Sequence, residues 1–110
     1  MWKELKGREQ LEEILNSSGK QIVVFKHSTR CGISSMALSR FGKNDFHPEA
    51  DYYLLDLIRF REISGSIAEI SGVMHESPQV LLFSNGKCVF HASHSAIRPS
   101  AIPLNAAVSS

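Results

Sequence analysis

Cys31 is the residue whose surroundings best suit covalent chemistry in this sequence. It is one of only two cysteines in 110 residues, the other being Cys88. The polar stretch 28–30 precedes it and a glycine follows it, which suits an exposed, reactive thiol better than a thiol buried in a core. A thiolate is the nucleophile in disulfide exchange, and neighbouring cations favour its formation. The candidate cations are Lys26, His27 and Arg30.

Position 34 decides which kind of disulfide chemistry Cys31 could perform. It holds Ser34, where a dithiol oxidoreductase would carry its second cysteine, so no Cys-x-x-Cys disulfide can form and the expected site is monothiol. Two alternatives stay open: Cys31 as an inert buried cysteine, and Ser34 as a first-turn helix residue whose hydroxyl bonds to the backbone. Cys88 stands in an apolar strand, and we interpret it as structural.

The elements that must position Cys31 alternate between strand and helix. Residues 21–26 form an apolar run without alternation, typical of a strand buried on both faces in the middle of a sheet. A helical stripe over 31–42 begins at or beside Cys31, where free N–H groups and the helix dipole stabilise an anion. The other expected elements are a short, weakly indicated strand at 2–5, helices at 7–15 and 60–72, strands at 51–57, 79–83 and 87–91 with an Asn85-Gly86 turn, and a final amphipathic helix after Pro99.

This order predicts a single α/β domain over residues 1–110 with a thioredoxin-like fold, a central mixed sheet flanked by helices on both faces. Thioredoxin-like folds hold a cis-proline opposite the active cysteine, and Pro78 opens the corresponding strand. An ordinary trans proline is the alternative, since only about one X-Pro bond in twenty is cis. With a cis bond, the backbone of Ser77 should pair with the backbone of a substrate.

Composition excludes several classes of partner. The 12 basic residues nearly balance the 11 acidic ones, so no field of one sign would attract nucleic acid or an anionic membrane.

The first residues lack the apolar run of a signal peptide, and no run of eighteen apolar residues occurs, so we expect a cytoplasmic protein. Metal binding is not expected either, because no cysteine or histidine pair has the spacing of a closed zinc site. The histidines are residues 27, 47, 75, 91 and 94.

Three segments together resemble the monothiol bacilliredoxins, a thioredoxin-like family of bacteria that make bacillithiol. The resemblance spans nearly the whole chain and rests on Phe25-Lys26-His27-Ser28-Thr29-Arg30-Cys31-Gly32-Ile33-Ser34, His75-Glu76-Ser77-Pro78-Gln79 and Ser93-His94.

The resemblance implies an enzyme that removes bacillithiol from mixed disulfides on other proteins. Cys31 would attack, the client thiol would leave, and bacillithiol would remain on Cys31 until a second thiol restored it. No tightly bound cofactor is implied, since bacillithiol acts as a co-substrate, and the partners are bacillithiolated client proteins, free bacillithiol and a flavoprotein reductase. The residues expected to support the thiolate or bind substrate are Lys26, His27, Thr29, Arg30, Gly32, Ser34, Ser77 and Pro78.

Gly32 departs from the family pattern, which usually reads Cys-Pro-Ile-Ser. A glycine at this position also brings the motif close to the Cys-Gly-Phe-Ser of monothiol glutaredoxins, which hold iron–sulfur clusters with glutathione. Two other functions therefore remain as alternatives: an iron–sulfur cluster carrier, and an interaction domain without chemistry.

Overall fold

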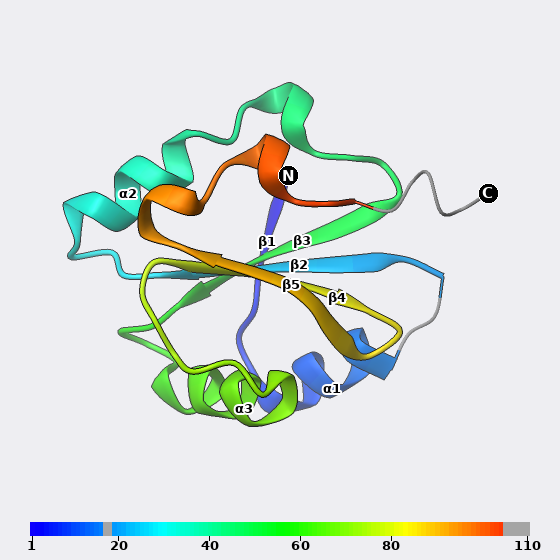
Figure 1. Ribbon diagram of the computed structural model, residues 1–110. Helices are drawn as coiled ribbons and strands as arrows, with labels where there is room; N and C mark the ends of the chain where they lie inside the picture. Colours follow the sequence, from blue (N-terminus) through cyan, green and yellow to red (C-terminus); the bar gives the residue numbers. More distant parts are fainter. Residues whose placement is uncertain (17–18, 105–110) are drawn as a thin grey trace.

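The computed structural model describes residues 1–16 and 19–104 as a five-stranded sheet with helices on both faces (Figure 1). Helices α1 and α3 cover one face, while α2 and the C-terminal turns cover the other. The strands are β1 (Trp2–Glu4), β2 (Gln21–His27), β3 (Ala50–Asp56), β4 (Gln79–Ser84) and β5 (Lys87–Ser93). The helices are α1 (Arg8–Asn16), α2 (Gly32–Ser39) and α3 (Arg61–Ser71). The predicted α/β architecture is confirmed.

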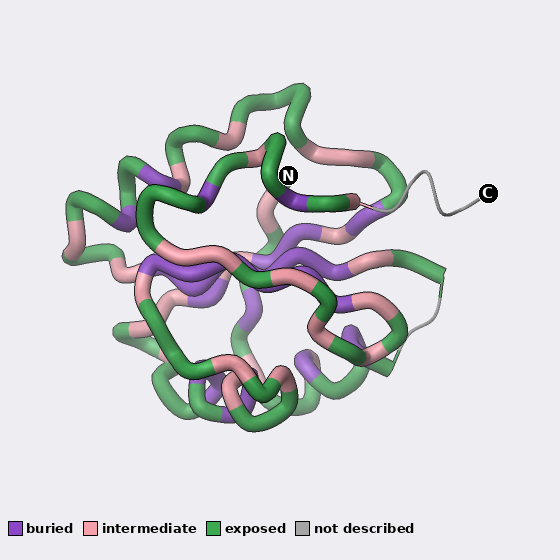
Figure 2. Tube along the Cα trace, viewed as in Figure 1, coloured by how far each residue is buried: buried purple, intermediate pink, exposed green. Residues whose placement is uncertain are grey.

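Strand β2 lies in the middle of the sheet, whose order is β1-β3-β2-β4-β5. It runs parallel to β3 and antiparallel to β4, and six of its seven residues are buried (Figure 2). A strand with neighbours on both edges and helices over both faces has no solvent side, which explains its lack of alternation in the sequence. The prediction of a central, doubly buried strand is therefore confirmed.

The two faces of the sheet build two separate cores. Val24 of β2 belongs to the core beneath α1 and α3, whereas Val23 and Phe25 belong to the core beneath α2. Successive residues of a strand point to opposite faces, so the next two residues must also separate. Lys26 accordingly lies on the α3 face and His27 on the α2 face, and each makes its side-chain hydrogen bonds there.

Two predicted helices differ from the structure. The helix expected over 31–42 spans only Gly32–Ser39, because Gly42 takes an extended backbone and starts a 3-10 turn at Lys43–Asp45. The helix expected after Pro99 is only a 3-10 turn, Pro99–Ala101. Ile102 precedes a proline, which disfavours helical backbone, and it is extended at φ −75° and ψ 115°. The expected helix position at Val108 lies outside the described residues.

The turn between β4 and β5 generates a prediction about stability. Gly86 has φ +80°, and a Cβ there would lie 3.2 Å from the backbone oxygen of Leu15. Gly86→Ala should therefore destabilise the fold by about 2 kcal/mol in urea unfolding. The control is Gly65→Ala in α3, where a Cβ meets nothing within 4 Å and alanine favours helix by up to about 1 kcal/mol. Equal effects of the two changes would contradict this account of the turn.

Candidate functional site

Cys31 lies between β2 and α2 as the N-cap residue of α2, with φ −111° and ψ 118°. Its N–H donates to the carbonyl of Ser28 at 3.1 Å, and its own carbonyl accepts the first helical hydrogen bond, from Ser35, at 3.1 Å. The residue is half-buried and its side chain makes no capping bond. The thiol thus stands at the positive end of a helix whose first N–H groups lack helical acceptors, as the sequence predicted.

Ser34 holds the loop before α2 together and is completely buried. Its Oγ accepts the N–H of Ser28 at 3.1 Å and lies 2.6 Å from Nδ1 of His27. The alternative in which this hydroxyl bonds to the backbone of the loop is therefore what the structure shows. Ser34 braces the segment that carries Cys31, so its contribution to the site is to position the thiol.

His27 fills the space between β2 and α2, with 7% of its surface exposed. Burial lowers its pKa below 6.5, although the nearby Asp56 carboxylate acts in the opposite direction. The ring is consequently neutral near neutral pH, and it pairs with Ser34. We expected His27 to be a cation beside Cys31, and the structure instead makes it a neutral brace for the loop.

Lys26 is completely buried on the other face of the sheet. Its Nζ lies 3.4 Å from the Ser64 carbonyl and 3.4 Å from Nδ1 of His75. Burial lowers its pKa from 10.5 to about 8. Lys26 was also expected to support the Cys31 thiolate, but its bonding partners belong to α3 and the loop after it.

The five remaining predicted residues lie in the Cys31 loop, at the start of α2, or at the cis bond before β4. Thr29, Arg30 and Gly32 are exposed, and Arg30 is therefore the one of the three candidate cations that faces solvent. The Ser77–Pro78 bond is cis, which confirms the sequence prediction. It immediately precedes β4, where Gln79 pairs with Lys26, so the cis bond and the end of β2 lie at the same end of the sheet.

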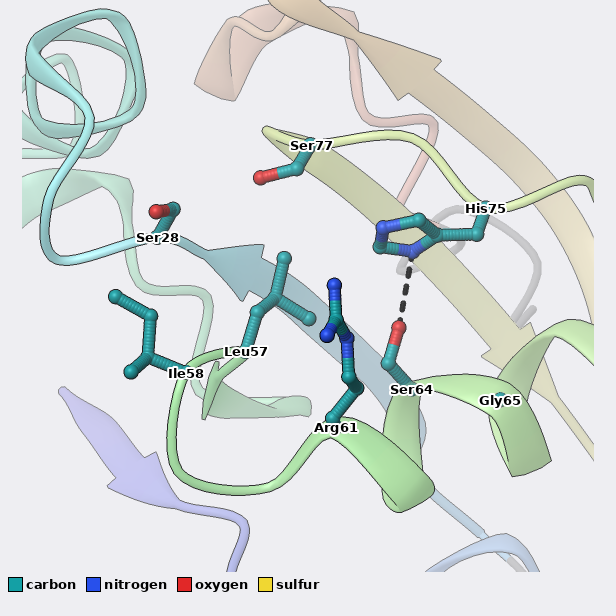
Figure 3. A pocket seen from close by; sticks show the side chains of 8 residues that line it. All are labelled: Ser28, Leu57, Ile58, Arg61, Ser64, Gly65, His75 and Ser77. Atoms are coloured by element: carbon teal, nitrogen blue, oxygen red, sulfur yellow. Dashed lines mark hydrogen bonds between the residues drawn. The ribbon is translucent and has the colours of Figure 1, made fainter.

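A cavity of about 530 Å³ adjoins this loop and holds residues that sequence reasoning missed (Figure 3). Arg61 and Ser64 enter it from α3, and His75 enters it from the segment before the cis bond, together with Ser77, which the sequence had predicted. His75 stood within a motif that carried the family resemblance, although no role was assigned to it. Nothing in the sequence distinguishes Arg61 from other arginines. The cavity is lined by Ser28, Leu57, Ile58, Arg61, Ser64, Gly65, His75 and Ser77.

Two negative findings apply to residues 1–16 and 19–104 alone. No three histidine, cysteine or acidic side chains in this part of the chain are grouped so that they could hold a metal ion. No helix there is long and apolar enough to span a bilayer.

The burial of Lys26 generates a prediction about pH. Its pKa is about 8 in the folded protein and near 10.5 when exposed, so between these values the unfolded chain binds more protons and stability rises with pH. Relative to Lys26→Met, the unaltered protein should gain about 2 kcal/mol between about pH 7 and pH 10. Urea unfolding of both proteins at the two pH values measures the difference. Parallel pH profiles would show that the ammonium group is not desolvated.

Comparisons with known proteins agree with this geometry. A family model described as monothiol bacilliredoxin BrxC matches residues 3–102. A solved structure described as a candidate oxidoreductase with a thioredoxin fold is 34% identical, with a TM-score of 0.80 over 90% of this chain and 88% of that one. Two thioredoxins share the fold: one from Malassezia sympodialis (19% identity, TM-score 0.73, covering 99% and 89%) and one from Trypanosoma brucei brucei (17%, 0.74, covering 91% and 82%). The chain therefore belongs to the monothiol bacilliredoxin family, whose role is in thiol redox chemistry.

Proposed function

We propose that this protein is a monothiol thiol–disulfide oxidoreductase that removes bacillithiol from mixed disulfides on client proteins. The observation that carries the proposal is the placement of Cys31 as the N-cap of α2, in a chain of the bacilliredoxin family. The cis Ser77–Pro78 bond at the same end of the sheet supports it, since thioredoxin-like proteins carry a cis-proline beside their reactive cysteine. The Ser77 backbone would then pair with the client.

The reaction consists of two thiol–disulfide exchanges. The Cys31 thiolate attacks the bacillithiol sulfur, the client S–S bond breaks, and the client cysteine leaves as a thiolate, so that bacillithiol becomes disulfide-linked to Cys31. A second bacillithiol then attacks this disulfide, releasing bacillithiol disulfide and free Cys31. A flavoprotein reductase would return bacillithiol disulfide to the thiol. Neither exchange needs a metal or a bound flavin.

Cys88 is badly placed to act as a resolving thiol for Cys31. It pairs with Phe83, which in turn pairs with Ile22 near the start of β2, whereas Cys31 follows the end of β2. Five residues of strand separate Ile22 from His27, a distance of about 16 Å. Burial also raises the pKa of the Cys88 thiol, whose Sγ lies 3.4 Å from the Phe90 carbonyl. The second thiol must therefore come from outside the chain.

The proposal predicts opposite outcomes for the two cysteines. Cys31→Ser should abolish release of bacillithiol from a modified client protein, because no thiol remains at the start of α2. Cys88→Ser should keep the rate within about twofold, because one thiolate suffices for the exchange. Mass spectrometry of the client over time measures release, and equal losses in both variants would instead identify Cys88 as a participant.

The same preparations distinguish the two alternative functions. An iron–sulfur carrier would be a brown dimer with visible absorption that is lost in Cys31→Ser. An interaction domain without chemistry would be colourless, and its Cys31 would react with iodoacetamide no faster than Cys88. A colourless protein with rapidly alkylated Cys31 supports the exchange reaction.

Gly32 gives a second prediction, because the family pattern carries proline there. Gly32 is the first residue of α2, where a missing N–H costs no helical bond, and Cys31 already has the extended backbone preferred before proline. Gly32→Pro should therefore stabilise the fold by up to about 1 kcal/mol in thermal unfolding. Release activity should persist, as the family pattern indicates. Marked destabilisation would mean that Gly32 holds a backbone angle that proline cannot adopt.

A further inference from the structure

Three hydrogen-bond donors converge on the cavity beside the Cys31 loop. Figure 3 shows the Arg61 guanidinium group, the outer ring nitrogen of His75 and the Ser77 hydroxyl pointing toward its centre from three sides. Arg61 is the first residue of α3, and the other two belong to the segment that leads into the cis bond. A cavity of about 530 Å³ is of the size that holds small-molecule ligands.

The partners of His75 determine which of its nitrogens donates. Its Nδ1 lies 2.9 Å from the Ser64 Oγ and 3.4 Å from Nζ of Lys26. An ammonium group only donates, so Nδ1 must accept and the neutral ring carries its proton on Nε2. Burial, together with the charges of Lys26 and Arg61, lowers the pKa of His75, although Glu76 opposes this. His75 therefore presents an N–H to the cavity at neutral pH.

The charges around the cavity favour an anion. Arg61 is permanently cationic, and the Lys26 ammonium lies behind His75. Among the eight described residues that line the cavity, none is acidic. Three acidic residues adjoin lining residues in sequence without lining the cavity, namely Asp56, Glu62 and Glu76. Asp56 Oδ1 accepts the N–H of Ile58 at 2.9 Å, and the Glu76 carboxylate lies 3.6 Å from Nδ1 of His94. A carboxylate would accept hydrogen bonds from all three donors.

The cavity is also continuous with the loop that holds the thiol. Ser28 lines it, and the carbonyl of Ser28 accepts the N–H of Cys31. A molecule whose sulfur is joined to Cys31 would thus have its remaining atoms beside the cavity. Leu57 and Ile58 supply an apolar wall for its carbon atoms.

We propose that this cavity, here named the Arg61 pocket, binds a carboxylate of the low-molecular-weight thiol while its sulfur is disulfide-linked to Cys31. The inference rests on the proposed function, in that Cys31 must form such a mixed disulfide. It adds that the enzyme selects thiols bearing a carboxylate, through Arg61, His75 and Ser77. Lys26 and Ser64 act as positioning residues, since they fix the proton of His75.

The test compares two probes that differ at their carboxylates: glutathione disulfide and the disulfide of glutathione dimethyl ester, in which uncharged methyl esters replace the carboxylates. The reduced full-length protein is titrated with each, and intact mass spectrometry gives the equilibrium constant for the mixed disulfide on Cys31. The unaltered protein should favour the acid over the ester by about fivefold, the upper range for an ion pair with an exposed arginine such as Arg61.

Three variants show whether the preference for the acid comes from the pocket residues or from positive charge anywhere on the protein. Arg61→Gln should remove most of this preference, and His75→Phe should reduce it. Arg59→Gln is the matched control, because Arg59 is an exposed arginine two residues away that does not line the pocket. It should leave the preference within about twofold, since Arg59 is as exposed as Arg61 but lies outside the pocket lining.

The possible failures are distinguishable. Equal formation of both mixed disulfides on the unaltered protein, or equal effects of Arg61→Gln and Arg59→Gln, would overturn the pocket and leave the proposed exchange reaction intact. Absence of any mixed disulfide on Cys31 with either probe would overturn the pocket as a site for thiols in general, whereas the proposed function fails only if Cys31 releases no bacillithiol from a modified client. Loss of preference in Arg61→Gln, with Cys31 still forming the ester adduct, would support the pocket and the capacity of Cys31 for disulfide exchange.

Discussion

The site depends on the alternation of side chains at the end of a strand that has no solvent face. Because β2 is covered on both sides, Lys26 and His27 must enter opposite layers, although they are neighbours in sequence. His27 braces the loop of Cys31 through Ser34, and Lys26 reaches His75 in the segment after α3. One strand end thereby organises both the thiol and the cavity beside it.

The buried polar side chains of Lys26 and Gln79 lower the stability of the fold at the end of β2. Lys26 loses its hydration and finds only long contacts at 3.4 Å, while the Oε1 of Gln79, its cross-strand partner, has no hydrogen-bond partner within the described part of the chain. Replacing such groups by apolar side chains often leaves a fold as stable or makes it more so. For Lys26, the buried ammonium group fixes the orientation of the His75 ring.

Local sequence patterns revealed the scaffold of the site better than its chemistry. The start of a helix and a continuous apolar run are signals carried by neighbouring residues, so the sequence was enough to place Cys31 and β2. The cis bond at Pro78 was predicted from the position of that proline in the expected fold. The direction of Lys26 was missed because nearness in sequence was taken as nearness in space. Arg61 was missed because it reaches the site only through the crossover from β3 to α3.

The buried hydroxyl of Ser34 also bears on how such a site could change over evolution. A cysteine at position 34 would create the dithiol sequence, yet sulfur is a much weaker hydrogen-bond acceptor than a hydroxyl oxygen. The Ser28 N–H and the His27 ring would then each lose a strong partner inside the protein. A change of Ser34 to cysteine would therefore add a second thiol and, at the same time, weaken the hydrogen bonds that brace the Cys31 loop.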